Sequence, residues 1–417
     1  EEQVKQQQEL QKLQRYPILK HGLPRGAPGN DKALTNQEEE LLHENGLYFY
    51  DQYISKVDQA RKIPVWVANT LSYQSNNQGG NQSNNNKGGN NRRGATTTPN
   101  TTATTNTKDN SSSGSGTGST VEVTRTKSEF GSDENDTMDE IFRASNSDYW
   151  HSGYDRGHMV PAGDIKSSQH AMNQTFYLNQ NIVPQNARNN RGYWRRFESF
   201  TRSLQKEYAK VHVITGPLFL AQDYDKTLEK GRNEFGEVTP VKRTLSHEVI
   251  GDGQVHVPTH LFKVILAEKK TKDTGGESNS STIGDKSKSL ILSAFILPNA
   301  PIASETELST FEVPIEEIEK RSGLRFFDKA RTCDSLSSHD GSKYLELASL
   351  CSDSRTKCKL FAEDPSLEYI HEIQEAKTVE QVQRVWLSML DKNIKPHDWT
   401  RSSYEDRIKR LSEKRQS

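Results

Sequence analysis

Several features that many proteins use are scarce or absent in this chain of 417 residues. Three cysteines, Cys333, Cys351 and Cys358, are too few for a disulfide framework, and their odd number predicts reduced thiols. No apolar run reaches the roughly 18 residues that a membrane-crossing helix needs. The Gly-x-x-x-x-Gly-Lys-Ser/Thr pattern of a phosphate loop is also missing. These absences exclude a disulfide-rich scaffold, a membrane span and a P-loop nucleotidase.

Hydrophobic side chains are also scarce, because they make up 31% of the sequence and the mean hydropathy is −0.89. Part of the chain is therefore not expected to pack into a core. The clearest such part is residues 74–120, where Asn, Gly, Ser and Thr dominate. Few side chains there can offset the entropy of ordering by burying surface. We predict a disordered insertion inside a domain, since regular patterns resume on both sides.

The net charge of −1 excludes a uniformly basic coat for nucleic acid and a strongly acidic tail. The charge is uneven along the chain, however. Residues 156–212 carry nine Lys or Arg against three acids, whereas residues 121–150 carry three against eight. Attraction for phosphate is therefore expected to be local, and binding should weaken with salt.

Alternation and β-branched or aromatic residues predict strands at 47–54, 121–125, 212–218, 260–266 and 290–297. The apolar residues 63–68 are expected to enter either a strand or a short helix, because Pro64 lies among them. A three-to-four-residue apolar period predicts a helix at 193–208. The polar stretch at 269–289 is expected to be a second loop insertion. Helical periodicity takes over after Phe311, which favours a helical C-terminal module.

The strongest chemical signal is the run Tyr-Asp-Arg-Gly-His that ends at His158. An imidazole can take a proton from water near neutral pH. The neighbouring guanidinium of Arg156 can hold a phosphate by paired hydrogen bonds. A single His-Arg pair is more often structural than catalytic, so the interpretation needs further motifs.

Two such motifs follow within 40 residues. The first is Asn181-Ile182-Val183-Pro184-Gln185, and the second is Asn-x-Gly-x-Trp-x-x-x-Glu, which runs from Asn190 to Glu198. Asn190 stands just before the expected helix, where free N–H groups and the helix dipole favour a phosphate nearby. Asn190 as a plain helix cap and Glu198 as a solvated carboxylate are the structural alternatives.

In this order, the three motifs resemble the DNA/RNA non-specific endonuclease family of ββα-metal nucleases. Within it, the mitochondrial endonuclease G-like subgroup and its exonuclease-like paralogues are most similar. The resemblance implies an α+β fold with a central antiparallel sheet and a helical C-terminal extension. The domains expected are an N-terminal arm at 1–36, a nuclease domain at 37–305 and a helical module at 306–417.

The resemblance also implies roles for individual residues. His158 matches the general base, and Asn190 matches the protein ligand of a Mg²⁺ ion, with Mn²⁺ as the alternative. Arg156 would bind phosphate, Asn181 would fix the His158 side of the site, and Glu198 would orient metal-bound water. Further substrate-binding candidates lie upstream of the motif, just after it, in the helix and in the C-terminal part: Arg125, Lys166, Arg191 and Phe326.

By the same resemblance the substrates are DNA and RNA, the products carry a 5′-phosphate, and no small-molecule cofactor is needed. The subgroup implies a homodimer in mitochondria, at the inner membrane or in the intermembrane space, with peripheral membrane association. The C-terminal module is expected to restrict access and to favour chain ends. A secreted or lysosomal scavenger nuclease of the same fold and a catalytically silent nucleic-acid-binding protein are the alternatives.

Overall fold

The computed structural model describes residues 7, 11–26, 46–72, 123–133, 138–221, 231–232, 238–239, 244–270, 289–331, 347–353, 356, 358, 360 and 365–413. The predicted insertion at 74–120, most of the loop at 269–289 and Cys333 lie outside the described residues. None of the helices in the described part is long and apolar enough to cross a membrane.

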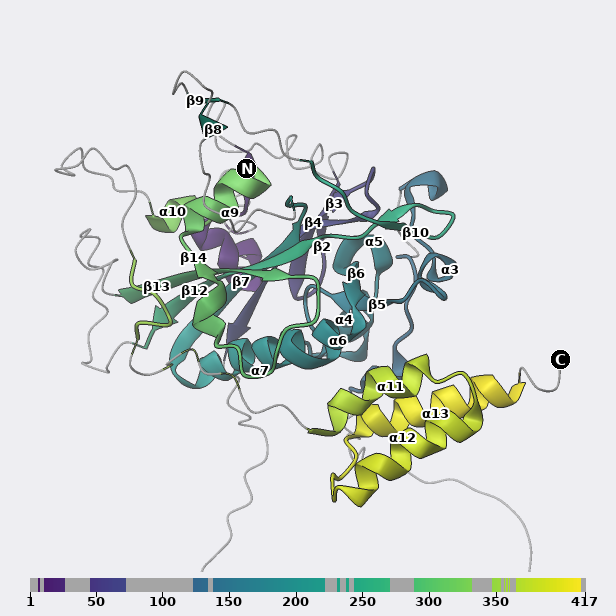
Figure 1. Ribbon diagram of the computed structural model, residues 1–417. Coiled ribbons are helices and arrows are strands. Elements are labelled where there is room, and N and C mark those ends of the chain that lie inside the picture. Colours follow the sequence, from purple (N-terminus) through teal and green to yellow (C-terminus); the bar gives the residue numbers. More distant parts are fainter. Residues whose placement is uncertain are drawn as a thin grey trace, which may run out of the picture. The chain divides into compact units, whose positions relative to one another are not determined.

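A seven-stranded antiparallel sheet forms the centre of the molecule, with the strand order β14-β13-β12-β7-β4-β3-β2 (Figure 1). Its strands are β2 (Leu47–Phe49), β3 (Tyr53–Asp58), β4 (Ile63–Ser72), β7 (Tyr208–Leu218), β12 (His260–Lys269), β13 (Leu290–Pro298) and β14 (Glu312–Val313). The predicted α+β class with a central antiparallel sheet is confirmed. The apolar runs of the sequence form the central strands β7, β12 and β13. Side chains on both faces of these strands are buried, which explains why the runs are almost continuously apolar.

Smaller two-stranded pairings surround this sheet. They join β1 (Arg25–Gly26) with β15 (Leu324–Arg325), β5 (Tyr154–His158) with β6 (Ile182–Asn186), β8 (Gly231–Arg232) with β9 (Val238–Thr239), and β10 (Val249–Ile250) with β11 (Val255–His256). The longer helices of the described part are α4 (Gln169–Gln174), α7 (Arg195–Ser203), α9 (Ile315–Ser322), α11 (Tyr369–Glu375), α12 (Val379–Asp391) and α13 (Asp398–Glu413). Short helical turns are η1 (Pro17–His21), η2 (Arg125–Lys127), η3 (Glu140–Phe142), α3 (Asn146–Tyr149), η4 (Ala162–Asp164), α5 (Leu178–Asn181), η6 (Leu204–Lys206), η7 (Leu308–Phe311), α10 (Asp328–Arg331) and η8 (Pro365–Glu368).

The two faces of the sheet carry separate hydrophobic cores. Alternate residues of β7 divide between them, since Val213 belongs to one cluster and Ile214 to the other. The Val213 face packs against Trp194, Phe197 and neighbouring residues of the helix around α7. The Ile214 face is covered by the N-terminal turn η1 and by α9 and α10. The active-site motifs lie with the first core, so the second face is remote from them.

Three predicted elements differ from the structure. Residues 47–54 form two strands, β2 and β3, because a tight turn at 50–52 reverses the chain. The described part of the strand expected at 121–125 is extended chain followed by the 3₁₀ turn η2. The helix expected at 193–208 starts earlier, at Ala187, and Tyr208 already begins β7.

The C-terminal third divides into two parts. Strand β14 extends the central sheet, β15 pairs with β1, and α9 contributes Ile315 and Ile318 to the second core. Residues 312–331 are thus continuous with the sheet and with the second core. Helices α11, α12 and α13 pack mainly on one another through a cluster that includes Ile373, Val382 and Met389.

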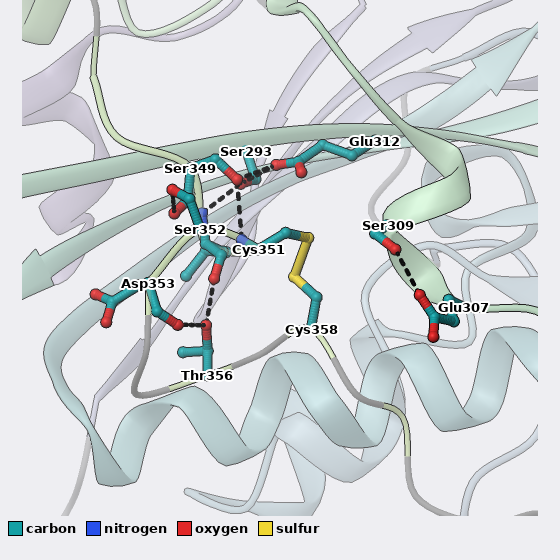
Figure 2. The surroundings of a disulfide bond; sticks show 11 residues. Ser293, Glu307, Ser309, Glu312, Ser349, Cys351, Ser352, Asp353, Thr356 and Cys358 are labelled. Atoms are coloured by element: carbon teal, nitrogen blue, oxygen red, sulfur yellow. Dashed lines mark hydrogen bonds between the residues drawn. A yellow bond between two sulfur atoms is a disulfide. The ribbon is translucent and has the colours of Figure 1, made fainter.

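The prediction of reduced thiols is wrong for two cysteines. Cys351 and Cys358 form a disulfide across a seven-residue separation, with their Cα atoms 4.8 Å apart (Figure 2). That separation falls in the range that a disulfide can bridge. Beside it, Ser349 and Ser293 both donate to one carboxylate oxygen of Glu312, which fastens this turn to β13 and β14. An odd cysteine count could not reveal that a turn brings two of them together.

Candidate active site

A β-hairpin-like pair and the helix that follows it carry the chemistry-bearing motifs (Figure 1). Strand β5 pairs antiparallel with β6, so that His158 lies opposite Ile182 and Asp155 opposite Gln185. Gly157 is required in this pair, because a Cβ added there would lie 2.2 Å from Oε1 of Gln185. The chain then continues from β6 directly into a helix. The arrangement is a strand-strand-helix unit with His158 on its first strand.

The helix of this unit has an unusual turn at the predicted metal residue. Asn186 caps α6 (Ala187–Asn189) by accepting from the Asn189 amide, and residues Asn190–Trp194 form a π-helix before α7. Asn190 is therefore in the second turn and is not the cap. Single π-turns within α-helices often occur at functional sites. The wider turn presents Asn190 and Arg191 toward β5.

Asp155 holds both of these side chains. Asn190 donates from Nδ2 to Oδ2 of Asp155 at 2.9 Å, which directs its amide oxygen Oδ1 away as the group able to bind a cation. Arg191 donates two hydrogen bonds, of 2.8 and 2.6 Å, to the same carboxylate. An amide oxygen is a ligand type that suits Mg²⁺. The donor set therefore fits a hard cation held mostly by water and substrate oxygens.

His158 is buried, with 7% of its surface exposed, and its Nε2 has no hydrogen-bond partner among the described residues. Its ring packs edge-on against Phe176 at 4.7 Å and against Phe130 at 5.3 Å. Burial, aided by the nearby charges of Arg125 and Arg156, lowers the pKa of His158 well below its ordinary value. The imidazole is consequently neutral at pH 7 and can accept a proton.

Asn181 fixes the chain immediately after His158. Its side chain is fully buried, accepts from the Val160 amide at 2.8 Å, and donates to the carbonyls of Val160 and Thr175 at 2.9 and 2.7 Å. Its own carbonyl accepts from the Met159 amide at 2.9 Å. These bonds satisfy every polar group of the Asn181 amide without leaving one for substrate. Asn181 is therefore placed to position His158 and not to react.

Two arginines flank the imidazole. The guanidinium of Arg156 lies 4.4 Å from the Phe130 ring centre and donates to Asn146. Arg125 comes from η2, outside the motif, and its charge interacts with Glu198, Asp155 and Arg191. Two cations beside a neutral base leave a local surplus of positive charge. A phosphate would be attracted to this position.

Glu198 lies deeper, next to a buried lysine that the sequence interpretation did not select. Lys263 on β12 is 1% exposed, donates to Thr215 at 2.8 Å and lies 4.9 Å from the Trp194 ring centre. Burial raises the pKa of Glu198 and lowers that of Lys263, while the attraction between them opposes both shifts. A lone charge within the apolar run 261–266 was the available signal for Lys263.

The remaining predicted substrate residues have different positions. Lys166 is exposed, and its charge interacts with Asp164, which pairs with Arg202 at 2.5 Å. Phe326 is fully buried against Phe262, so a base cannot stack on it and that prediction is wrong. The physical reason is that α9 and α10 bury the second core, whose location the sequence does not reveal.

A cleft with a volume of about 1060 Å³ opens beside Arg156 and Asp155. Its lining includes basic residues from the strand-strand-helix unit and from the C-terminal helices: Arg156, Arg188, Arg191, Lys377, Arg407 and Arg410. Trp150 also lines it, is 71% exposed and stacks on His151. A basic cleft with an exposed aromatic ring has the properties of a nucleic-acid groove.

A neutral histidine and an asparagine held by an aspartate on a strand-strand-helix unit, beside a basic cleft, define the class of ββα-metal nucleases. The sequence profile of the DNA/RNA non-specific endonuclease family matches residues 35–332. That match covers more than half of the chain, and the chain belongs to this family.

Individual relatives support the same grouping. "Nuclease EXOG, mitochondrial" of Mus musculus is 36% identical over 275 residues, which cover 66% of this chain and 64% of that protein. The Danio rerio protein of the same name is 34% identical over 280 residues, or 67% of this chain and 69% of that one. "Mitochondrial nuclease" of Saccharomyces cerevisiae is 41% identical over 198 residues, 47% of this chain and 53% of that protein. The chain thus spans a little under two thirds of the mouse relative's length.

Proposed function

We propose that this chain is a Mg²⁺-dependent nuclease that hydrolyses phosphodiester bonds of DNA and RNA with little base specificity. The observation that carries the proposal is the neutral His158, which is on the same unit as Asn190 and whose pKa the nearby charges of Arg125 and Arg156 help to lower. The family description and the names of the relatives support the reaction type. Phosphate contacts carry no sequence information, which agrees with the lack of a base-reading module.

The residues divide the reaction between them. The imidazole of His158 takes a proton from the attacking water, and Arg156 and Arg125 bind the phosphate and its developing charge. Asn190 would hold a Mg²⁺ ion through its amide oxygen, and such an ion would supply charge stabilisation for the leaving 3′ oxygen. Asp155 keeps Asn190 oriented, and Glu198, whose charge interacts with that of Arg125, would orient water near that ion. Cleavage on the 3′-oxygen side leaves a 5′-phosphate.

We further propose a preference for chain ends. The cleft beside Arg156 is lined on one side by Gln374, Lys377 and Arg410 of the C-terminal helices. Helices along a cleft narrow the paths by which a continuous duplex can enter it. Relatives named as mitochondrial support a mitochondrial location for this protein, and a homodimer is part of the same proposal.

The proposal is tested by digestion of labelled DNA and RNA with Mg²⁺, with EDTA, and with the His158→Ala variant. We expect cleavage with Mg²⁺ alone and a 5′-phosphate on the products. Unchanged digestion by His158→Ala would refute the mechanism, and no digestion by the unaltered protein would favour a silent nucleic-acid binder.

End preference is tested separately, with a closed circular DNA and a linear DNA of the same sequence, with and without a blocked 5′ end. The linear DNA should be cut faster, and the block should slow it. Lys377→Glu and Arg410→Glu, which reverse charge on the helical wall of the cleft, should change the ratio of linear to circular cutting. An unaltered ratio in both variants would show that these helices do not set the preference.

A further inference from the structure

A second cluster of ionisable side chains lies on the opposite face of the sheet. His21 from η1, His212 from β7 and Glu268 from β12 converge there, and their three donor atoms lie within 4.8 Å of one another. It is the one group of three or more His, Cys, Asp or Glu side chains with this proximity that the described residues contain. We propose that this group binds a Zn²⁺ ion that fastens the N-terminal segment to the sheet.

The two histidines lie within hydrogen-bond distance of the same carboxylate oxygen. Nε2 of His21 lies 2.8 Å and Nε2 of His212 lies 3.0 Å from Oε1 of Glu268. Two imidazole nitrogens and one carboxylate are a known ligand set for Zn²⁺, whereas Mg²⁺ prefers oxygen ligands. At Zn–ligand bond lengths of about 2.1 Å, two ligand atoms of a tetrahedral Zn²⁺ ion lie about 3.4 Å apart. The donor atoms here lie within 4.8 Å of one another, so the most distant pair would have to approach by at most about 1.4 Å.

The surroundings support the ring orientation that a metal needs. The Oγ1 atom of Thr70 lies 2.9 Å from Nδ1 of His212 and can accept a hydrogen bond from Nδ1–H. Metal-bound histidines usually donate their second ring N–H to such a partner, which fixes the tautomer. The His21 and His212 side chains are 7% and 0% exposed, whereas Glu268 retains 19%. The open side at Glu268 gives room for water as the fourth ligand.

The position in the fold indicates a structural ion. His212 shares its face of β7 with Ile214, in the second core, whereas His158 packs against Phe176 in the first. The two metal sites are therefore separated by the sheet. An ion at His21 would tie residues 11–26 to β7 and β12, in addition to the buried Tyr16 and Ile18.

A metal-free cluster of hydrogen bonds is the alternative. In it each histidine donates Nε2–H to Glu268, and the Thr70 hydroxyl donates to Nδ1 of His212. Zn²⁺ would take the place of both Nε2 protons, which would move to Nδ1 of each ring, and the Thr70 bond would reverse. The two states thus differ in the tautomer of the histidines and in their need for a charged carboxylate.

Glu268→Gln separates these alternatives, because the amide oxygen still accepts from both histidines but carries no charge. The full-length protein is titrated with Zn²⁺ and, as a spectroscopic probe, Co²⁺, in excess Mg²⁺ to occupy oxygen-only sites. We expect one tightly bound Zn²⁺, a tetrahedral Co²⁺ spectrum and a Zn²⁺-dependent rise in Tm that EDTA reverses. In Glu268→Gln the Kd should rise by about 100-fold or more, since even an outer-shell partner contributes 10–100-fold.

The matched control is the other histidine pair, His247 and His256, whose ring nitrogens lie 2.8 Å apart without a carboxylate in the group. His247→Gln with His256→Gln should leave the stoichiometry and Kd unchanged. Absence of stoichiometric binding, binding that survives Glu268→Gln, or binding lost in the His247/His256 control would each overturn the proposal. DNA cleavage is not the readout, so failure here is distinct from failure of the proposed nuclease function.

Discussion

The two faces of the central sheet hold buried histidines in opposite electrostatic settings. His158 has an unpaired Nε2 and two neighbouring arginines, whereas His212 has partners at both nitrogens, Thr70 and Glu268. Burial lowers the pKa of both, to about 4 for His212. Burial alone therefore does not mark a reactive histidine. The two histidines differ because Nε2 of His158 has no hydrogen-bond partner among the described residues and lies near two cations. This imidazole can therefore accept a proton only from a molecule that enters the site.

The largest expected effect follows from removing each histidine in turn. His158→Ala should reduce kcat by about 10²–10⁴-fold, because a general base is lost, with little change in stability. His212→Ala should lose far less activity but lower the free energy of unfolding by about 2 kcal/mol, because Glu268 loses a buried partner. Mg²⁺-dependent cleavage and urea unfolding of both variants check this. If His158→Ala and His212→Ala lost activity equally, the assignment of catalysis to the His158 face of the sheet would be wrong.

Asp155→Asn tests how the catalytic face is organised. The change keeps an acceptor for Asn190 but removes the charge that binds Arg191. We expect apparent Mg²⁺ affinity to fall by about 10–100-fold, as for other outer-shell partners. The measurement is the cleavage rate as a function of Mg²⁺ concentration. The control is Asp58→Asn, which breaks the exposed ion pair with Arg61 and should leave the apparent Mg²⁺ affinity unchanged.

Gly157→Ala tests the close approach of β5 and β6. The added methyl would collide with the buried Gln185 side chain, so we expect a loss of about 1–3 kcal/mol in unfolding free energy. Gly131→Ala is the control, because its Cβ would meet nothing within 4 Å, and it should change stability by less than about 0.5 kcal/mol. Equal denaturation midpoints would show that the strand pair can relax around the methyl.

The smallest effect is a shift in pH dependence. His158 is active when neutral, so activity should persist below pH 6.5 and decline only as pH falls through its lowered pKa. Arg156→Gln removes a like charge, which raises the pKa of His158 and moves the acid limb of the kcat profile to higher pH. The shift is separable from the loss of phosphate binding, which appears in KM. A shift toward lower pH would contradict the assigned electrostatics.

Much of the site follows from local sequence. His158, Arg156, Asn190 and Glu198 fall in short motifs whose spacing is fixed by two adjacent strands and one helix. Arg125 also reaches the site, although η2 replaces the predicted strand. Lys263 was missed because it comes from a distant strand, and the pairing of β12 with β7 brings it beside Glu198. Phe326 was misassigned because an aromatic pattern does not reveal which core will bury it.

Residue types and their short-range spacing were enough to predict the family and the histidine, arginine and asparagine that the proposed reaction needs. Three further properties could be seen only in the folded molecule: which histidine nitrogen lacks a partner, which cysteines meet, and that His21, His212 and Glu268 converge. Those properties depend on burial and on contacts between residues up to 247 positions apart. Such contacts exist only after the strands have paired.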